Sequence, residues 1–125
     1  MRIKEIKVEV KPYHEEIDEI SKKIQEISEG KVNKKEEKII FNSIKELRKF
    51  LTPERIRLIQ TIKNKKPKSI YELAKLLDRD RKSVIVDLEV LKKIGLVELK
   101  KQKVKKRTTV VPKVNYNRIN IAVPV

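Results

Sequence analysis

The pattern of apolar and polar residues predicts a long helix in the second half of the chain. Apolar residues recur every three or four positions from Val84 to Ile94, which is the period of one buried helix face. Asp80 precedes this run and Gly95 follows it, and these residue types are preferred at the start and just after the end of a helix. The pattern therefore predicts a helix from about residue 81 to residue 94.

A shorter helical pattern lies directly before this helix. Ser69 is followed three residues later by Glu72, which is the sequence signature of a capping box at a helix start. Two helices that are joined by the short segment Leu77–Asp80 form a helix-turn-helix. The expected buried face of the shorter helix comprises Ile70, Leu73, Ala74 and Leu77.

A strand, a basic stretch and a second strand are predicted after Gly95. Apolar residues at 96, 97 and 99 begin the first strand, and six of the eight residues at 100–107 are positively charged. Because like charges repel, we expect this stretch to be an exposed hairpin tip, and a basic tip of this kind is suited to the phosphates or the minor groove of a nucleic acid. The final strand, at about 116–123, is expected to pair either with the first of these strands or with an N-terminal strand. The residues it is expected to bury are Ile119, Ile121 and Val123.

The first 42 residues have the pattern of a strand, a helix and a second strand. Ile6, Val8 and Val10 alternate with charged residues, which predicts a strand with one buried face. Isoleucines at helical spacing predict an amphipathic helix over 13–28 that stops at Gly30, followed by a loop at 31–37 and a short strand at 38–42. The same isoleucines fit packing within the chain and a seam between two subunits, and both alternatives stay open.

Two further helices are predicted between this segment and Ser69. Ser43 with Glu46 forms a second capping box, and Thr52 with Pro53 starts the next helix as N-cap and first helical residue. The expected inner face of the first helix comprises Ile44, Leu47, Phe50 and Leu51. That of the second comprises Ile56, Ile59 and Ile62.

Charge is distributed unevenly along the 125 residues. The formal net charge is +15, of which residues 1–51 carry +2 and residues 52–125 carry +13. The positive charge therefore lies in the same half as the predicted helix-turn-helix. This is the electrostatic footprint expected of a module that binds a polyanion.

Several function classes are disfavoured by what the sequence lacks. There is no cysteine, and His14 is the single histidine, so we expect no metal site, no cofactor and no enzymatic activity. Both glycines, Gly30 and Gly95, are expected as helix stops, so no glycine-rich phosphate loop is present. With no signal peptide and no apolar run of about 18 residues, we expect a cytoplasmic protein that is associated with a chromosome or plasmid and makes no membrane contact.

Three segments carry a resemblance to a known family. Ser-Ile-Tyr-Glu-Leu-Ala-Lys at 69–75, Arg-Asp-Arg-Lys-Ser-Val at 79–84 and Asp-Leu-Glu-Val-Leu-Lys-Lys-Ile-Gly-Leu-Val at 87–97 together resemble a winged helix-turn-helix of the MarR/ArsR-like kind. The chain is similar to a group of small archaeal DNA-binding proteins. The resemblance implies sequence-specific binding to double-stranded DNA and control of transcription.

We therefore expect an α+β fold with two parts. Residues 1–42 would form a strand-helix-strand extension, for which a role in dimerisation stays open, and residues 43–125 a winged helix-turn-helix domain. The expected partners are double-stranded DNA and a second copy of the chain, because one recognition helix covers few bases. The sequence outlines no pocket for a small-molecule effector. The predicted DNA-binding residues are Ser69, Arg79, Arg81, Lys82, Ser83, Val86, Lys101, Lys103, Lys105, Lys106 and Arg107.

Ile85 and Val86 depart from the family pattern, which often has polar or basic residues at these positions. Either the two side chains contact thymine methyl groups, or one or both pack against a neighbouring element, and we favour packing for one of them. Two other functions stay open: a winged helix that binds a partner protein through this surface, and an architectural protein that binds nucleic acid without sequence preference.

Overall fold

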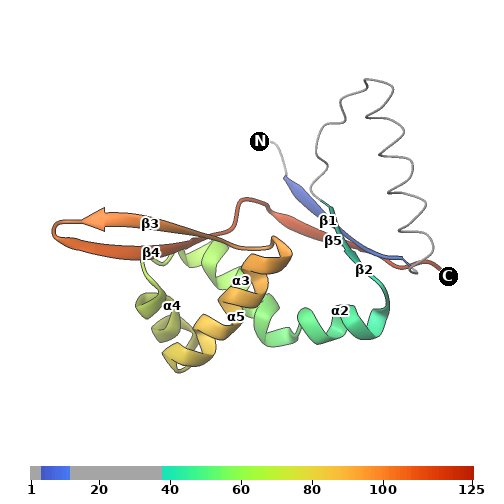
Figure 1. Ribbon diagram of the computed structural model, residues 1–125, viewed down its shortest axis with the longest axis horizontal. Coiled ribbons are helices and arrows are strands. Elements are labelled where there is room, and N and C mark those ends of the chain that lie inside the picture. The colour runs from blue at the N-terminus through green and yellow to red at the C-terminus, as the bar shows by residue number, and fades with distance from the viewer. Residues whose placement is uncertain (1–3, 12–37) are drawn as a thin grey trace, which may run out of the picture.

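The computed structural model describes residues 4–11 and 38–125 of the chain. This part is α+β, as predicted, with four helices and two separate sheets. In Figure 1 the long hairpin lies at the left and the three-stranded sheet at the right, and the helices lie below them. The predicted helix over 13–28, its stop at Gly30 and the loop at 31–37 lie outside the described residues.

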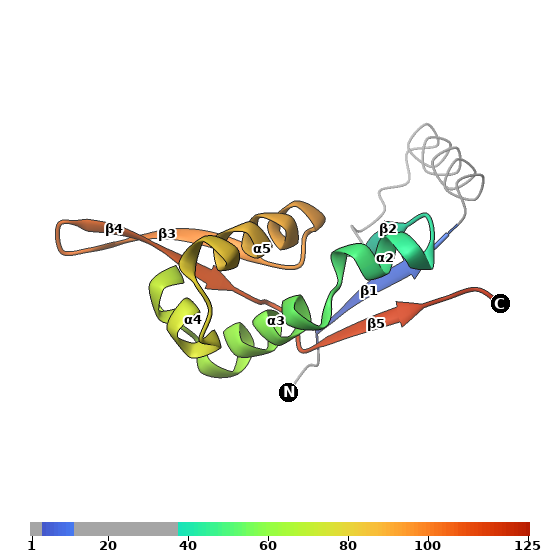
Figure 2. The same ribbon diagram turned by 90° about the horizontal axis from the view of Figure 1, so that it is seen from below.

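The three-stranded sheet joins both ends of the described chain. It contains β1 (Glu5–Val10), β2 (Lys38–Phe41) and β5 (Arg118–Ala122) in the order β2-β1-β5, and both neighbouring pairs are parallel. The final strand thus pairs with the N-terminal strand, which was one of the two predicted alternatives. Figure 2 shows β5 beside β1 at the edge of the sheet.

The central strand β1 is buried more completely than its alternating pattern predicts. Ile6, Val8 and Val10 are buried, as expected, but Glu9 on the other face is buried as well. Glu5 and Lys7 on that face are exposed, as predicted, so the prediction fails at Glu9 alone. The reason is that the side chains of three lysines cover the Glu9 carboxylate.

Three ammonium groups neutralise the Glu9 carboxylate. Lys7, Lys11 and Lys38 each place Nζ 2.9–3.1 Å from one of its oxygens. Burial alone would raise the pKa of Glu9, but hydrogen bonds from Lys7, Lys38 and Lys11 outweigh burial and lower this pKa from 4.5 to about 2.

The first two helices begin at the predicted caps. In α2 (Ile44–Phe50), Ser43 Oγ accepts a hydrogen bond from the backbone N–H of Glu46, and α3 (Pro53–Lys65) starts at Thr52 with proline at its beginning. Leu47 is buried as expected, but Ile44 is 48% exposed, so its placement in the inner face is wrong. Ile44 is the first residue of the helix, and within the described residues it stays largely exposed, which the helical spacing alone does not reveal.

The next two helices also follow their predicted boundaries. They are α4 (Ile70–Leu77) and α5 (Arg81–Ile94), with N-caps at Ser69 and Asp80. Gly95 ends α5 with a φ of 92°, a left-handed conformation that glycine adopts without steric cost.

The main core lies where α3, α4 and α5 meet. The predicted inner face of α5 is buried at Val84, Leu88 and Leu91, and Ile94 packs against the same core. Tyr116, which follows β4, closes this core by donating a 2.8 Å hydrogen bond to the carbonyl oxygen of Leu96, and burial raises the pKa of Tyr116. Other fully buried members are Leu58, Leu73 and Leu96.

The second sheet is a hairpin of β3 (Glu98–Val104) and β4 (Arg107–Lys113), and these strands are antiparallel. Lys105 and Lys106 form the loop between the paired residues Val104 and Arg107. Lys105 has a φ of 59°, so a lysine occupies a position that usually favours glycine. Figures 1 and 2 both show the tip of this hairpin projecting beyond the helices.

The predicted burial of the final strand is largely wrong. Ile119 is partly buried against the core, but Ile121 and Val123 are exposed. In the described part of the chain β5 has β1 on one side only. An alternating pattern shows which side chains share one face of a strand. It does not show whether another element packs over that face.

Candidate nucleic-acid interface

The solvent-facing side of α5 is a continuous stripe of four residues at helical spacing. Lys82, Ile85, Val86 and Glu89 lie on the side opposite the buried Val84, Leu88 and Leu91, and all four are exposed. Arg81, in the first turn, is exposed too. Within residues 4–11 and 38–125, neither Arg81 nor Lys82 makes an ion pair, so both cations are available to a ligand.

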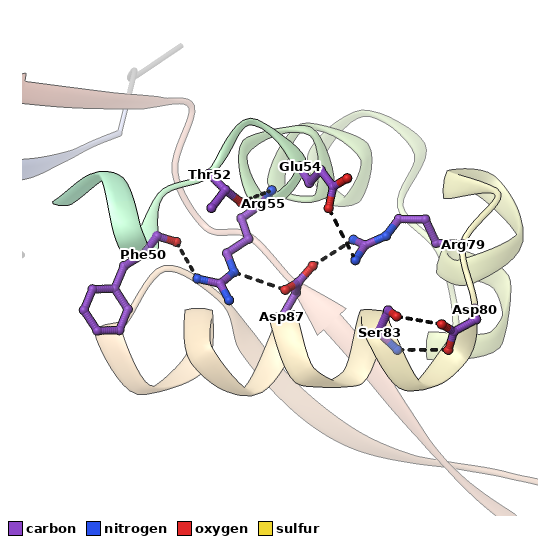
Figure 3. A network of polar contacts seen from close by, with 8 residues as sticks. All are labelled: Phe50, Thr52, Glu54, Arg55, Arg79, Asp80, Ser83 and Asp87. Carbon is purple, nitrogen blue, oxygen red and sulfur yellow. Dashed lines mark hydrogen bonds and ion pairs between the residues drawn. The ribbon is translucent and has the colours of Figure 1, made fainter. Parts of the chain in front are cut away.

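A polar network fixes the opposite side of α5. Asp87 lies in the middle of the helix and is only 8% exposed. Its two carboxylate oxygens accept one hydrogen bond each, from Arg55 Nε at 3.1 Å and from Arg79 Nη1 at 2.8 Å. Figure 3 shows the two guanidinium groups on either side of this carboxylate. Asp87 therefore links α5 to α3 and to the turn that precedes α5.

Arg55 extends this network to the end of α2. Its Nη1 donates to the backbone oxygen of Phe50 at 2.9 Å (Figure 3) and to that of Lys49 at 3.2 Å, and both residues lie in the last turn of α2. The carboxylate of Glu54 lies 3.7 Å from Arg79 Nη2 but is largely exposed, so this contact contributes little. Together these contacts hold α5 in a fixed orientation relative to α2 and α3.

Three of the predicted DNA-binding residues have partners within the chain. Arg79 binds Asp87, and Ser69 Oγ accepts from the backbone N–H of Glu72 at 3.0 Å. The Ser83 hydroxyl donates to Asp80 Oδ2 at 2.6 Å (Figure 3). Hydrogen bonds from the Ser83 side chain and backbone lower the pKa of Asp80. The geometry gives these residues structural roles, and their contact with DNA stays a prediction.

The other predicted cations gather on the β3–β4 hairpin. All five are exposed, and none forms an ion pair within the described part of the chain. Between 98 and 113 there are seven basic residues and one acidic residue, Glu98. The cross-strand register places Lys100 opposite Val111, Lys101 opposite Val110 and Lys103 opposite Thr108, so no two cations face each other directly. The five residues are Lys101, Lys103, Lys105, Lys106 and Arg107.

A shallow groove between α4 and the start of α5 adds residues that were not among the predicted contacts. The Lys75 ammonium lies 5.2 Å from the centre of the Tyr71 ring, and Tyr71 is exposed. The contact between Tyr71 and Lys75 could have been predicted from the sequence, because the two residues are four positions apart on the polar side of a short helix. The groove is lined by Tyr71, Ala74, Lys75, Asp78, Arg79, Asp80 and Arg81.

Two other kinds of site find no support in the described residues. Across 4–11 and 38–125, no three histidine, cysteine or acidic side chains are grouped so that they would hold a metal ion. No helix in that same part is long and apolar enough to cross a membrane.

The described chain is thus an α+β protein with a basic hairpin and an exposed, cation-flanked helix face. It belongs to the HVO_A0114 family, whose model matches residues 50–121. This match covers α3, α4, α5 and the hairpin, and most of β5. Searches of curated proteins and of solved structures found no match.

Proposed function

We propose that this protein is a sequence-specific, double-stranded DNA-binding regulator of transcription with a winged helix-turn-helix domain. In this proposal α4 and α5 are the helix-turn-helix, α5 is the recognition helix in the major groove, and the β3–β4 hairpin is the wing. The observation that carries the proposal is the occurrence of exposed cations at two places, the first turn of α5 and the hairpin, in the same half of the chain.

The two groups of cations have different roles in the proposal. Arg81 and Lys82 occupy the first turn of α5, the part of a recognition helix that reaches base edges, and arginine pairs well with guanine. The hairpin cations contact phosphates or the minor groove, where they add affinity and fix the position of the protein on the duplex. Arg79, held by Asp87, positions α5 from within the protein.

We also propose that the protein acts as a homodimer on a two-fold symmetric target. One recognition helix reads few base pairs, and half-sites about 34–36 Å apart, or a multiple of that spacing, fit a symmetric pair. The exposed Ile121 in β5 and Val123 directly after this strand offer apolar surface for subunit contact. Light scattering at DNA-binding concentrations tests this, and a monomer would contradict it.

The function is tested by selecting bound fragments from genomic DNA in the presence of random duplex competitor. A two-fold motif bound at least about 10³ times more tightly than random DNA supports the proposal. Equal affinity for all duplexes with a steep salt dependence supports an architectural protein instead. No binding to DNA would favour the third candidate, a domain that binds a protein partner through Ile85 and Val86.

A further inference from the structure

The exposed stripe of α5 has an unusual composition for the surface of a basic protein. Val86 is 59% exposed and Ile85 is 37% exposed, and they lie between Lys82 and Glu89. We expected one of them to pack against a neighbouring element; Ile85 is covered over most of its surface and Val86 is the more exposed, but both keep surface that is accessible to solvent. Two adjacent branched apolar side chains at the centre of a charged surface indicate a ligand that carries apolar groups to contact them.

The surroundings of these two side chains indicate what that ligand is. Arg81 and Lys82 lie one turn away, and residues 52–125 carry a net charge of +13. A partner protein would need acidic groups beside its apolar groove to pair these cations, whereas a polyanion supplies negative charge along its whole length. In the major groove of DNA the only apolar group on the base edges is the 5-methyl group of thymine.

We propose that Ile85 and Val86 recognise thymine 5-methyl groups, so that the target half-site contains thymines under the centre of α5. This inference rests on the proposed function, because it assumes that α5 lies in the major groove. The cations of the first turn then bind next to these thymines, and the apolar pair selects among sequences that the cations alone would bind equally well.

The fixed orientation of α5 makes such contacts specific. Asp87, next to Val86 in the chain, is held by two arginines on the side of the helix that faces the protein. The helix is therefore not free to rotate its apolar pair away from the bases. Valine and isoleucine also have few side-chain rotamers in a helix, so little conformational freedom is lost when they contact a methyl group.

The test removes the methyl groups one at a time. Once a target has been selected as above, each thymine is replaced by deoxyuridine, which keeps the base pair and lacks only the 5-methyl group. For the unchanged protein we expect about three- to tenfold weaker binding at the thymines under α5 and no change elsewhere. Val86→Ala and Ile85→Ala each remove the side chain that contacts one of these methyl groups. In each variant, deoxyuridine at the thymine that this side chain contacts should therefore weaken binding almost no further.

Ile44→Ala is the matched control. Ile44 is also an exposed isoleucine in a helix, but it lies in α2. We expect this variant to bind the target as tightly as the unchanged protein and to keep the full sensitivity to deoxyuridine. Circular dichroism and melting temperature confirm that all three variants are folded.

Two results would overturn the inference alone. One is a specific target whose binding no deoxyuridine weakens, and the other is a deoxyuridine effect that stays unchanged in both Ile85→Ala and Val86→Ala. In either case the proposed function stands. If selection recovers no preferred sequence, the proposed function fails and the inference fails with it.

Discussion

The network around Asp87 makes a strong prediction about stability. Asp87→Asn keeps the shape of the side chain but replaces one of two acceptor oxygens by an NH₂ group. Arg55 and Arg79 have side chains that are 16% and 21% exposed, so the variant leaves two poorly solvated guanidinium groups beside a neutral amide. One of the two hydrogen bonds of Asp87 is lost, and the charge that attracts both arginines disappears.

The expected loss follows from the burial of this site. Removing one partner of a buried ion pair costs about 3–5 kcal/mol. Asparagine still accepts one hydrogen bond, and water reaches the arginines in part, so we expect a loss of about 2–3 kcal/mol. For a chain of this size that corresponds to a melting temperature about 6–15 °C lower.

Urea unfolding and thermal melting measure this effect. Glu89→Gln is the matched control, because Glu89 lies two residues further along α5 and is exposed, and its free energy of unfolding should change by less than about 0.5 kcal/mol. A double-mutant cycle with Arg79→Gln should give a coupling energy above about 1 kcal/mol. Asp87→Asn with the stability of the unchanged protein would refute the claim that this network holds α5.

Three further predictions follow from single positions. Because the pKa of Glu9 is lowered to about 2, its ion pairs stabilise the fold above about pH 4.5, and this contribution is lost as the pH falls towards 2. Glu9→Gln should therefore be less stable at pH 7 by at most about 3 kcal/mol, with a difference that shrinks in acid unfolding curves; a constant difference would contradict this. Gly95→Ala should lower the free energy of unfolding by about 1–2 kcal/mol in urea, because φ is 92° although an added Cβ meets nothing within 4 Å. Lys105→Gly should raise the melting temperature slightly, because the left-handed backbone conformation of Lys105 costs about 1 kcal/mol that glycine avoids. The same variant should weaken DNA binding equally for all sequences. A lower melting temperature would refute the proposed strain.

Local features were predictable from the sequence. The starts of α3, α4 and α5 at Thr52, Ser69 and Asp80 each match a cap residue whose side chain accepts a backbone hydrogen bond. These signals depend on three or four neighbouring residues, so they can be recognised in the sequence without knowledge of the tertiary structure. The buried side of α5 was predictable for the same reason, since its spacing reflects one helix alone.

Long-range features were not predictable in the same way. Asp87 sits beside apolar residues on α5, and its partner Arg55 is 32 positions away, so no local pattern marked it as the centre of a network. The sequence left the partner of β5 open between two strands. The exposure of Ile121 likewise depends on which elements lie over one face of a sheet, which alternation within a strand does not encode.

The central claim is that α5 reads bases while the hairpin binds the backbone. The most direct measurement compares Arg81→Ala with Lys106→Ala on the selected target and on random duplex, over a range of salt concentrations. We expect Arg81→Ala to cost about 1–3 kcal/mol on the target and little on random DNA, with relaxed preference at one base pair. Lys106→Ala should weaken both duplexes alike and reduce the salt slope by about 1. If the two variants have the same effect on target and random DNA, α5 does not read the sequence.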